Sequence, residues 1–285
     1  MADTIIQGVL LGGLYCLFAL GLSLMFGVMR LTNIAQGDFI VMASFGAVAL
    51  ASVIGERPLW IALVLLPAGF AVGYLLQRYL LNGTLGRDPL PSLVVTFGLS
   101  IIVQNALLEV FSADPRALGS GGLNTRSIAI GPVTVGELPL LILATALACT
   151  GGLQTLFSQT AAGRAFRAVS DDRDIARLMG VQADRVYATA TAIAFALIAL
   201  AGVFQAMRTT VAPADGPMLL LFAFEAVIIG GMGSFWGTLV GALVLGVTQQ
   251  VGFAFDPGWG LWFGHLVFLA VLVVRPQGLF PKTKG

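Results

Sequence analysis

The chain has 285 residues, of which 58% are hydrophobic and 10% are charged, and its mean hydropathy is +0.94. Roughly a quarter of the residues of an ordinary soluble domain are charged, so this composition excludes a soluble globular protein and indicates a membrane protein. The formal net charge of +1 excludes no class of partner, because in a membrane protein the placement of basic residues matters more than their sum.

Nine apolar runs divide the chain, most of them near the length of about 20 residues that a helix needs to cross a membrane. Turn-rich pieces such as "GERP" and "FDPGW" separate them. Two runs are short, which leaves eight to ten helices. We expect an all-α polytopic transmembrane bundle in which residues 1–285 form one domain. The runs begin near Ile5, Phe39, Leu59, Leu93, Leu138, Val186, Met218, Phe235 and Gly258.

Lysine and arginine are unevenly distributed between the two sides that alternating helices create. One side collects eleven of them and the other collects four. Because basic residues favour the cytoplasmic side of a membrane, the N-terminus is expected outside and the C-terminus in the cytoplasm. The larger group is Arg30, Arg78, Arg87, Arg164, Arg167, Arg173, Arg177, Arg185, Arg275, Lys282 and Lys284, and the smaller is Arg57, Arg116, Arg126 and Arg208.

Polar residues lie between the first two runs, in the stretch "TNIAQGD". Asn33, Gln36 and Asp38 could cap and start the next helix at the membrane surface. Alternatively, the stretch is unwound backbone that faces a cavity. The residues alone leave both interpretations open.

The fourth run carries Thr96, Ser100 and Gln104 at intervals of four residues, which places them on one face of a helix. Such a face can line a translocation path, or it can bond neighbouring helices together, which is the commoner role. Both interpretations predict that the face turns inward.

Charge is concentrated in "GRAFRAVSDDRDIARLMG", residues 163–180, where seven of eighteen positions are charged. Ser170 is a suitable N-cap, the aspartates after it suit the first turn, and Gly180 can take the left-handed conformation that ends a helix. A short helix is therefore predicted within a cytoplasmic loop of residues 158–184.

One face of that short helix is apolar, because Ile175, Leu178 and Met179 follow helical spacing. The helix can lie on lipid headgroups. Alternatively, the three side chains form an apolar knob, ringed by charges, that docks in a groove of a cytoplasmic partner.

Glu225 lies within an apolar segment, "LLLFAFEAVIIGGMG". An ionisable group in the hydrocarbon indicates a functional role, although Glu225 could instead reach water or Arg208 near the outer end of the segment. The glycines that follow it favour close helix packing. His265 has no Cys, Asp or Glu close to it in sequence, so we expect a packing residue without chemistry.

Several motifs in order resemble the permease subunits of bacterial branched-chain amino acid ABC transporters. The first helix and the stretch after it, "GLYCLFALGLSLMFGVMRLTNIAQGDFIVM", resemble the N-terminal signature of that family. "VVTFGLSIIVQN" resembles its middle helix, "AVIIGGMGSFWGTLVGALVLG" its glycine-rich C-terminal half, and "GRAFRAVSDDRDIARLMGVQADRV" its cytoplasmic loop. "RPQGLF" is typical of its C-terminus.

The resemblance implies that the charged loop is a coupling helix that sits in a cleft of an ATPase subunit. The chain itself has no GxxxxGK[ST] motif, so no cofactor or enzyme activity is expected, and two ATP-binding subunits come from elsewhere. The coupling residues are predicted to be Arg164, Arg167, Asp172, Ile175, Leu178, Met179 and Gly180. The candidate translocation path consists of Asn33, Gln36, Thr96, Ser100, Gln104 and Glu225.

Further partners implied by the resemblance are a second related permease and a periplasmic or extracellular solute-binding protein, with no nucleic acid. The expected cargo is a branched-chain or other small neutral amino acid, and the expected location is the bacterial inner membrane. Relatives with similar signatures carry urea, amides or other small polar solutes. An ion-coupled secondary transporter is the rival mechanism, because it gives Glu225 a role as a proton or Na⁺ site.

Overall fold

The computed structural model describes residues 1–55, 57–85, 90–119, 122–123, 126–130 and 133–280. Each of the nine predicted runs forms a helix: α1 (Ala2–Met29), α2 (Gln36–Ile54), α3 (Pro58–Tyr79), α4 (Leu90–Phe111), α5 (Glu137–Gln159), α8 (Ala183–Arg208), α9 (Gly216–Gly230), α10 (Phe235–Phe255) and α11 (Trp259–Val274). Within the described residues, eight helical spans are long and apolar enough to cross a membrane, and α11 is shorter. The predicted all-α polytopic bundle is therefore confirmed.

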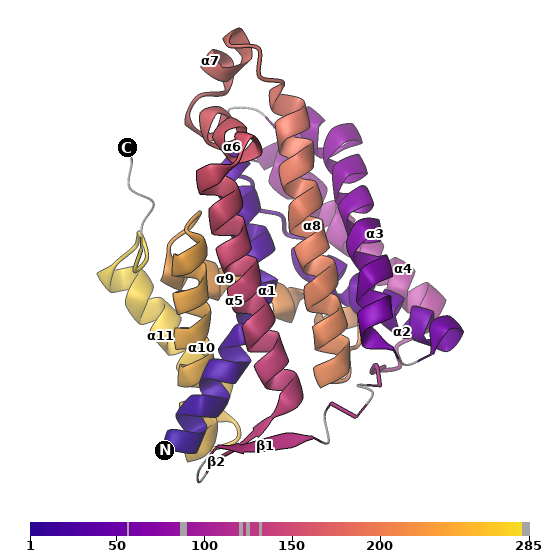
Figure 1. The fold of residues 1–285 in the computed structure, drawn as a ribbon, viewed down its shortest axis with the longest axis vertical. Coiled ribbons are helices and arrows are strands. Elements are labelled where there is room, and N and C mark those ends of the chain that lie inside the picture. Colours follow the sequence, from indigo (N-terminus) through magenta and orange to yellow (C-terminus); the bar gives the residue numbers. More distant parts are fainter. Residues whose placement is uncertain (56, 86–89, 120–121, 124–125, 131–132, 281–285) are drawn as a thin grey trace.

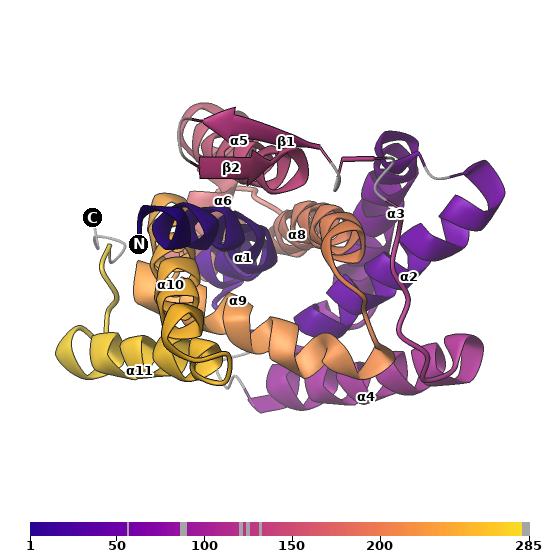
Figure 2. The same cartoon turned by 90° about the horizontal axis from the view of Figure 1, so that it is seen from below.

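Helices α1 and α8 form the centre of the bundle. In Figure 2, α1 is surrounded by α5, α8, α9 and α10, while α3 and α11 lie at the periphery. Glycine allows α1 and α10 to approach closely, because a Cβ built on Gly12 would lie 2.7 Å from backbone atoms of α10. Most buried hydrophobic residues, from α1 to α10, join one continuous cluster.

Two helices begin inside the bundle instead of at its ends. The Gln36 side chain, at the start of α2, donates to the carbonyl oxygen of Phe18 over 2.6 Å, and Phe18 lies about 16 Å along α1 from its C-terminal end at 1.5 Å per residue. A Cβ built on Gly37 would lie 1.9 Å from the carbonyl oxygen of Gly216, at the start of α9. The stretch "TNIAQGD" thus runs back into the bundle, and its last three residues form the first turn of α2. That its unwound part faces a cavity stays a prediction.

The two ends of the bundle differ (Figure 1). One end, here called the loop end, carries the short helices α6 (Ala161–Asp171) and α7 (Arg173–Leu178). The other, the hairpin end, carries strands β1 (Ser127–Ile130) and β2 (Val133–Gly136), which pair antiparallel. The hairpin was not predicted, because its four-residue strands lie in a turn-rich stretch. Arg116 and Val211 pair their backbones at this end, with N···O distances of 3.0 and 2.8 Å.

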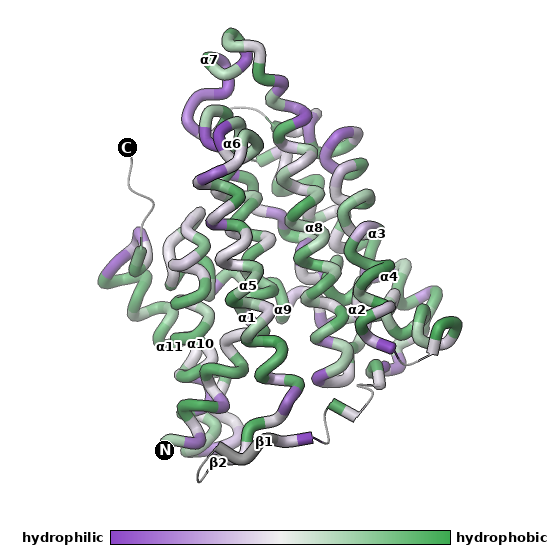
Figure 3. The backbone as a smooth tube through the Cα atoms, in the orientation of Figure 1, coloured by the Kyte–Doolittle hydropathy of each residue, from purple (hydrophilic) through white to green (hydrophobic). Residues whose placement is uncertain are grey.

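Hydrophilic residues gather at the loop end, over α6 and α7, whereas the middle of the bundle is hydrophobic (Figure 3). In the larger group of basic residues, Arg30 follows α1 and Arg78 lies near the end of α3, while Arg164, Arg167, Arg173 and Arg177 lie in α6 and α7. Arg87, Lys282 and Lys284 lie outside the described residues.

Candidate coupling loop and translocation path

The charged loop contains two helices where one was predicted. The side chain of Thr160 caps α6 by accepting from the Gly163 amide over 3.0 Å. Phe166 and Val169 are buried on the inner face of α6, while Arg164 is exposed and Arg167 is half-buried. This division follows helical spacing, which places the apolar side chains on one face of a short amphipathic helix.

The N-cap of α7 is Asp172, and the prediction of Ser170 was wrong. The Asp172 carboxylate accepts from the amides of Asp174 and Ile175, each over 2.9 Å. Ser170 lies in the last turn of α6 and donates its hydroxyl to the carbonyl oxygen of Gly27, over 2.8 Å. Gly180 has a φ of +83°, the left-handed conformation that was predicted for the residue ending this helix.

Three apolar side chains project from the tip of the loop. Ile175, Leu178 and Met179 are 59%, 87% and 81% exposed, and helical spacing gives them one face. Large apolar side chains grouped on a surface mark interaction sites more often than chance exposure. Ala176 is the buried residue of α7.

The loop is fastened to the bundle at several points. Arg173 and Arg177 of the loop both bind the same carboxylate oxygen of Asp184, at the start of α8, over 3.1 Å. The Arg173 guanidinium also lies 5.5 Å from the centre of the Tyr187 ring and donates to the Leu85 carbonyl over 3.3 Å. With the Ser170–Gly27 bond, these contacts tie the loop to α1, α8 and the segment after α3.

A second group of polar side chains surrounds Asp38, in the first turn of α2. Gln104 of α4 donates to the Asp38 carboxylate over 2.8 Å, and Ser100 also hydrogen-bonds to it. The carboxylate lies against the first residue of α9, where a Cβ built on Gly216 would be 1.9 Å from it. Because helix N-termini favour negative charge, Asp38 lies where the positive ends of two helices meet.

Asn33 and Gln36 are fully buried beside this group. The Asn33 side-chain oxygen accepts from the Ala35 amide over 3.1 Å. Among the residues that the structure describes, no partner is found for the Asn33 Nδ2 or the Gln36 Oε1 atom. Buried polar atoms without partners are rare, so this part of the interior retains unused hydrogen-bonding capacity.

The predicted inward face of α4 is real, but its members differ in their contacts. Thr96 is buried and bonds back to the carbonyl oxygens of Ser92 and Leu93, while Ser100 and Gln104 reach Asp38. The structure therefore brings together Asp38, Ser100 and Gln104 with Gln36 and Asn33 nearby, and leaves Thr96 one turn farther along α4.

Glu225 lies apart from that group and pairs with His265 of α11. The carboxylate is 1% exposed, and one of its oxygens lies 2.5 Å from His265 Nδ1. Within the described residues the ion-pair partner of Glu225 is His265, and no ion pair with Arg208 is found. His265, expected to be a packing residue, has its Nδ1 atom satisfied by this carboxylate. Forty positions separate the two residues, so no local sequence pattern could have linked them.

A family model described as a branched-chain amino acid transport system permease component matches residues 4–275. The chain belongs to this family. It is a multi-pass membrane permease of the ABC transporter class.

Individual relatives match over most of the chain. It is similar to the high-affinity branched-chain amino acid transport permease BraD of Pseudomonas aeruginosa, with 27% identity over 98% of this chain and 95% of the relative. LivH of Escherichia coli is 26% identical over 98% and 94%. The fructose import permease FrcC of Rhizobium meliloti is 30% identical over 86% of this chain and 68% of the relative. No solved structure matches.

Proposed function

We propose that this permease is one subunit of an ATP-driven importer in a bacterial inner membrane, where it forms half of the translocation pathway. The proposed cargo is a branched-chain or other small neutral amino acid. The observation that carries the proposal is the α7 tip, an exposed apolar face on a charged loop that is fastened to the core of a permease of this family.

The orientation belongs to the same proposal. Basic residues are more numerous at the loop end, so the positive-inside rule favours the loop end in the cytoplasm. The N-terminus, at the hairpin end (Figure 1), is then outside. There a solute-binding protein delivers cargo to the hairpin end.

Coupling follows from the way the loop is attached. Two ATPase subunits move toward each other when they bind ATP. Each of them binds the coupling helix of one of two related permeases. In this chain, a displacement of α7 is transmitted to α8 by the ion pairs of Arg173 and Arg177 with Asp184. It is transmitted to α1 by the hydrogen bond of Ser170. Since α1 and α8 form the centre of the bundle, a displacement of the loop moves the helices that line the interior.

The finer proposal concerns the polar group around Asp38. Two helices start inside the bundle there, and discontinuous helices form the substrate sites of many transporters. A free amino acid carries both an ammonium and a carboxylate. In an open state of the path, Asp38 attracts the ammonium, and the unused groups of Asn33 and Gln36 supply hydrogen bonds.

Two alternatives have support of their own. The fructose import permease among the relatives favours the possibility of another small polar cargo, such as urea or an amide. The pair of buried Glu225 and half-buried His265 favours an ion-coupled secondary transporter, because such a pair can bind and release a proton.

The central test removes the apolar tip without altering charge. Leu178→Ala is compared with Asp171→Ala in proteoliposomes that contain all subunits, by substrate-stimulated ATP hydrolysis and uptake. A buried apolar anchor commonly contributes about 2 kcal/mol or more to an interface, and a rim charge contributes less. We expect Leu178→Ala to lower coupled ATP hydrolysis more than ten-fold and Asp171→Ala to lower it less than three-fold, roughly as those free energies imply.

The outcome that contradicts the proposal is equally specific. If α7 merely rests on lipid, Leu178→Ala keeps wild-type uptake and co-purifies normally with the ATPase. Membrane insertion is checked by the yield of monodisperse protein, so that misfolding is not mistaken for uncoupling.

A further inference from the structure

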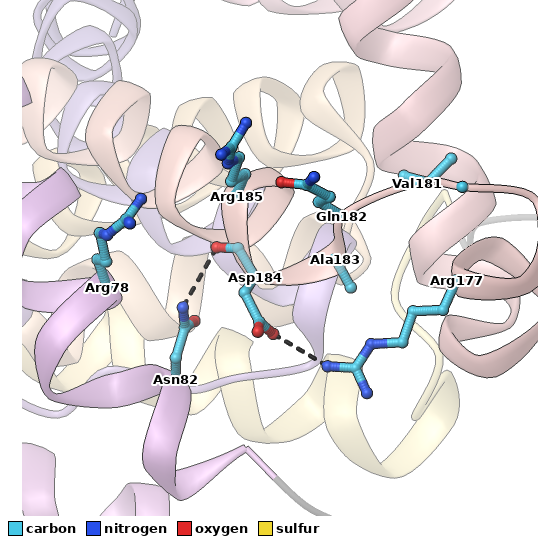
Figure 4. Close-up of a pocket in the computed structure, with 9 residues that line it drawn as sticks. Arg78, Asn82, Arg177, Val181, Gln182, Ala183, Asp184 and Arg185 are labelled. Carbon is cyan, nitrogen blue, oxygen red and sulfur yellow. Dashed lines mark hydrogen bonds and ion pairs between the residues drawn. The ribbon is translucent and has the colours of Figure 1, made fainter.

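A cleft of about 600 Å³ opens beside the coupling loop, between the end of α3 and the start of α8 (Figure 4). Its volume lies within the range of about 300–1,000 Å³ that is typical of small-molecule sites. Its lining is strongly polar and includes Arg78, Asn82, Arg177, Gln182, Asp184 and Arg185. The proposed coupling route uses the Arg177–Asp184 ion pair in this lining and leaves Arg78 and Arg185 without a role.

The cleft carries more positive than negative charge. Among the described residues, three arginines line it and Asp184 is the one carboxylate in the lining, and that carboxylate already pairs with Arg173 and Arg177. Within the described part of the chain, neither Arg78 nor Arg185 forms an ion pair. The Arg78 guanidinium donates to the hydroxyl of Tyr74 over 3.2 Å.

The positions of the two arginines indicate what kind of anion reaches them. Arg78 lies one residue before the end of α3 and Arg185 lies in the first turn of α8, so both are at the border between membrane and water. Most of α3 is exposed, and Leu75 and Tyr79 next to Arg78 are 52% and 77% exposed. The acyl chains of a lipid beside α3 can pack on that exposed apolar face, which places the lipid headgroup next to Arg78.

We propose that this cleft binds the phosphate of an anionic lipid, such as phosphatidylglycerol, from the leaflet at the loop end. Guanidinium groups bind phosphate through two parallel charge-assisted hydrogen bonds. The side-chain amides of Asn82 and Gln182 offer further donors to the glycerol hydroxyls of the headgroup. Since Asn82 also donates to the Asp184 carbonyl over 3.2 Å, a bound lipid adjoins the residue that fastens the coupling loop to α8.

The experiment measures lipid binding to the full chain and does not require transport. Purified permease in detergent is titrated with phosphatidylglycerol or phosphatidylcholine, and retained lipid is counted by native mass spectrometry. Wild-type protein should prefer phosphatidylglycerol. The double variant Arg78→Gln with Arg185→Gln should lose roughly ten-fold or more in apparent affinity for it, because two charge-assisted bonds are removed. The matched control, Arg30→Gln with Arg275→Gln, removes two exposed charges from the same end and should bind as wild type does.

Each other result has a defined meaning. Equal binding of the two lipids by wild-type protein, or unchanged binding by the double variant, overturns the proposal. Competition by millimolar inorganic phosphate assigns the cleft to a free anion instead of a lipid. If the double variant keeps its lipid preference but loses ATPase co-purification, the cleft receives an acidic protein side chain. Failure of the Leu178→Ala test leaves this proposal intact, since lipid binding is measured without the ATPase.

Discussion

At the scale of single residues, the pair of Glu225 and His265 shows how a carboxylate can be buried within an apolar helix. A lone carboxylate buried in a membrane protein is costly, and a partner lowers that cost. Glu225 is 1% exposed while the His265 side chain is 37% exposed, so the pair links the interior to the outer face of α11. This geometry is sufficient to hold α11 against α9 without any proton transport.

Glu225→Gln should therefore retain most ATP-driven uptake, with a loss of less than about three-fold. The amide oxygen still accepts a hydrogen bond from His265, whereas Glu225→Ala leaves a partly buried imidazole unpaired and destabilises the fold by about 1–3 kcal/mol. Uptake by proteoliposomes with internal ATP and no proton gradient is the measurement. Uptake that follows an imposed proton gradient without ATP, and that disappears in Glu225→Gln, establishes the rival mechanism.

At the scale of elements, glycine determines how closely the helices approach. Gly37 and Gly216 bring the first turns of α2 and α9 into backbone contact, and Gly230, Gly237 and Gly241 do the same for α9 and α10. The glycine-rich segment predicted close helix packing, without naming the two helices that meet. The first was hidden, because Gly37 and Gly216 are far apart in sequence and flanked by residues typical of an ordinary helix start.

Gly37→Ala should destabilise the permease, because the new methyl group would lie 1.9 Å from a backbone oxygen of α9 and the helices must separate. Overpacking of this kind costs about 1–3 kcal/mol. Gly98→Ala is the matched control, since a Cβ on Gly98 of α4 meets nothing within 4 Å and alanine favours a helix. Thermal inactivation in detergent compares the two. Equal midpoints for Gly37→Ala and wild type contradict the close approach of α2 and α9.

Hydropathy predicted the existence and order of the nine helices, because a spanning helix needs a long apolar run whatever its neighbours. Hydropathy could not predict how far inside the bundle a helix begins. Nothing in "TNIAQGD" states that α2 begins inside the bundle, since that position depends on its contacts with Phe18 and Gly216. Likewise, helical spacing predicted the face of Ser100 and Gln104, but their meeting with Asp38 required the tertiary fold.

At the scale of the whole molecule, the loop end and the hairpin end differ in charge and in the kind of structure that they carry. The loop end has helices with an exposed apolar tip, and the hairpin end has a small sheet and a backbone bridge between Arg116 and Val211. An importer needs such asymmetry, because its two faces meet different partners.

The proposed orientation predicts which engineered cysteines an impermeant maleimide reaches. In a background without Cys16 and Cys149, Asp171→Cys should react only after cell lysis, while Asp114→Cys should react in intact cells. Both positions are exposed, in contrast to half-buried Ser170. The reverse pattern of labelling places the loop end outside and removes the basis for coupling to a cytoplasmic ATPase.

The burial of α1 has a consequence for biogenesis. This helix is made before its neighbours α5, α8, α9 and α10, so it must reside in lipid without them until they follow. In their most apolar windows, α1 and α3 have the same mean hydropathy of 2.2, although 89% of the α1 window and 11% of the α3 window are buried in protein. Helices of membrane proteins insert before they associate. The apolar composition of α1 therefore suits two environments in succession: the hydrocarbon of the bilayer, and then the packed protein interior that replaces it.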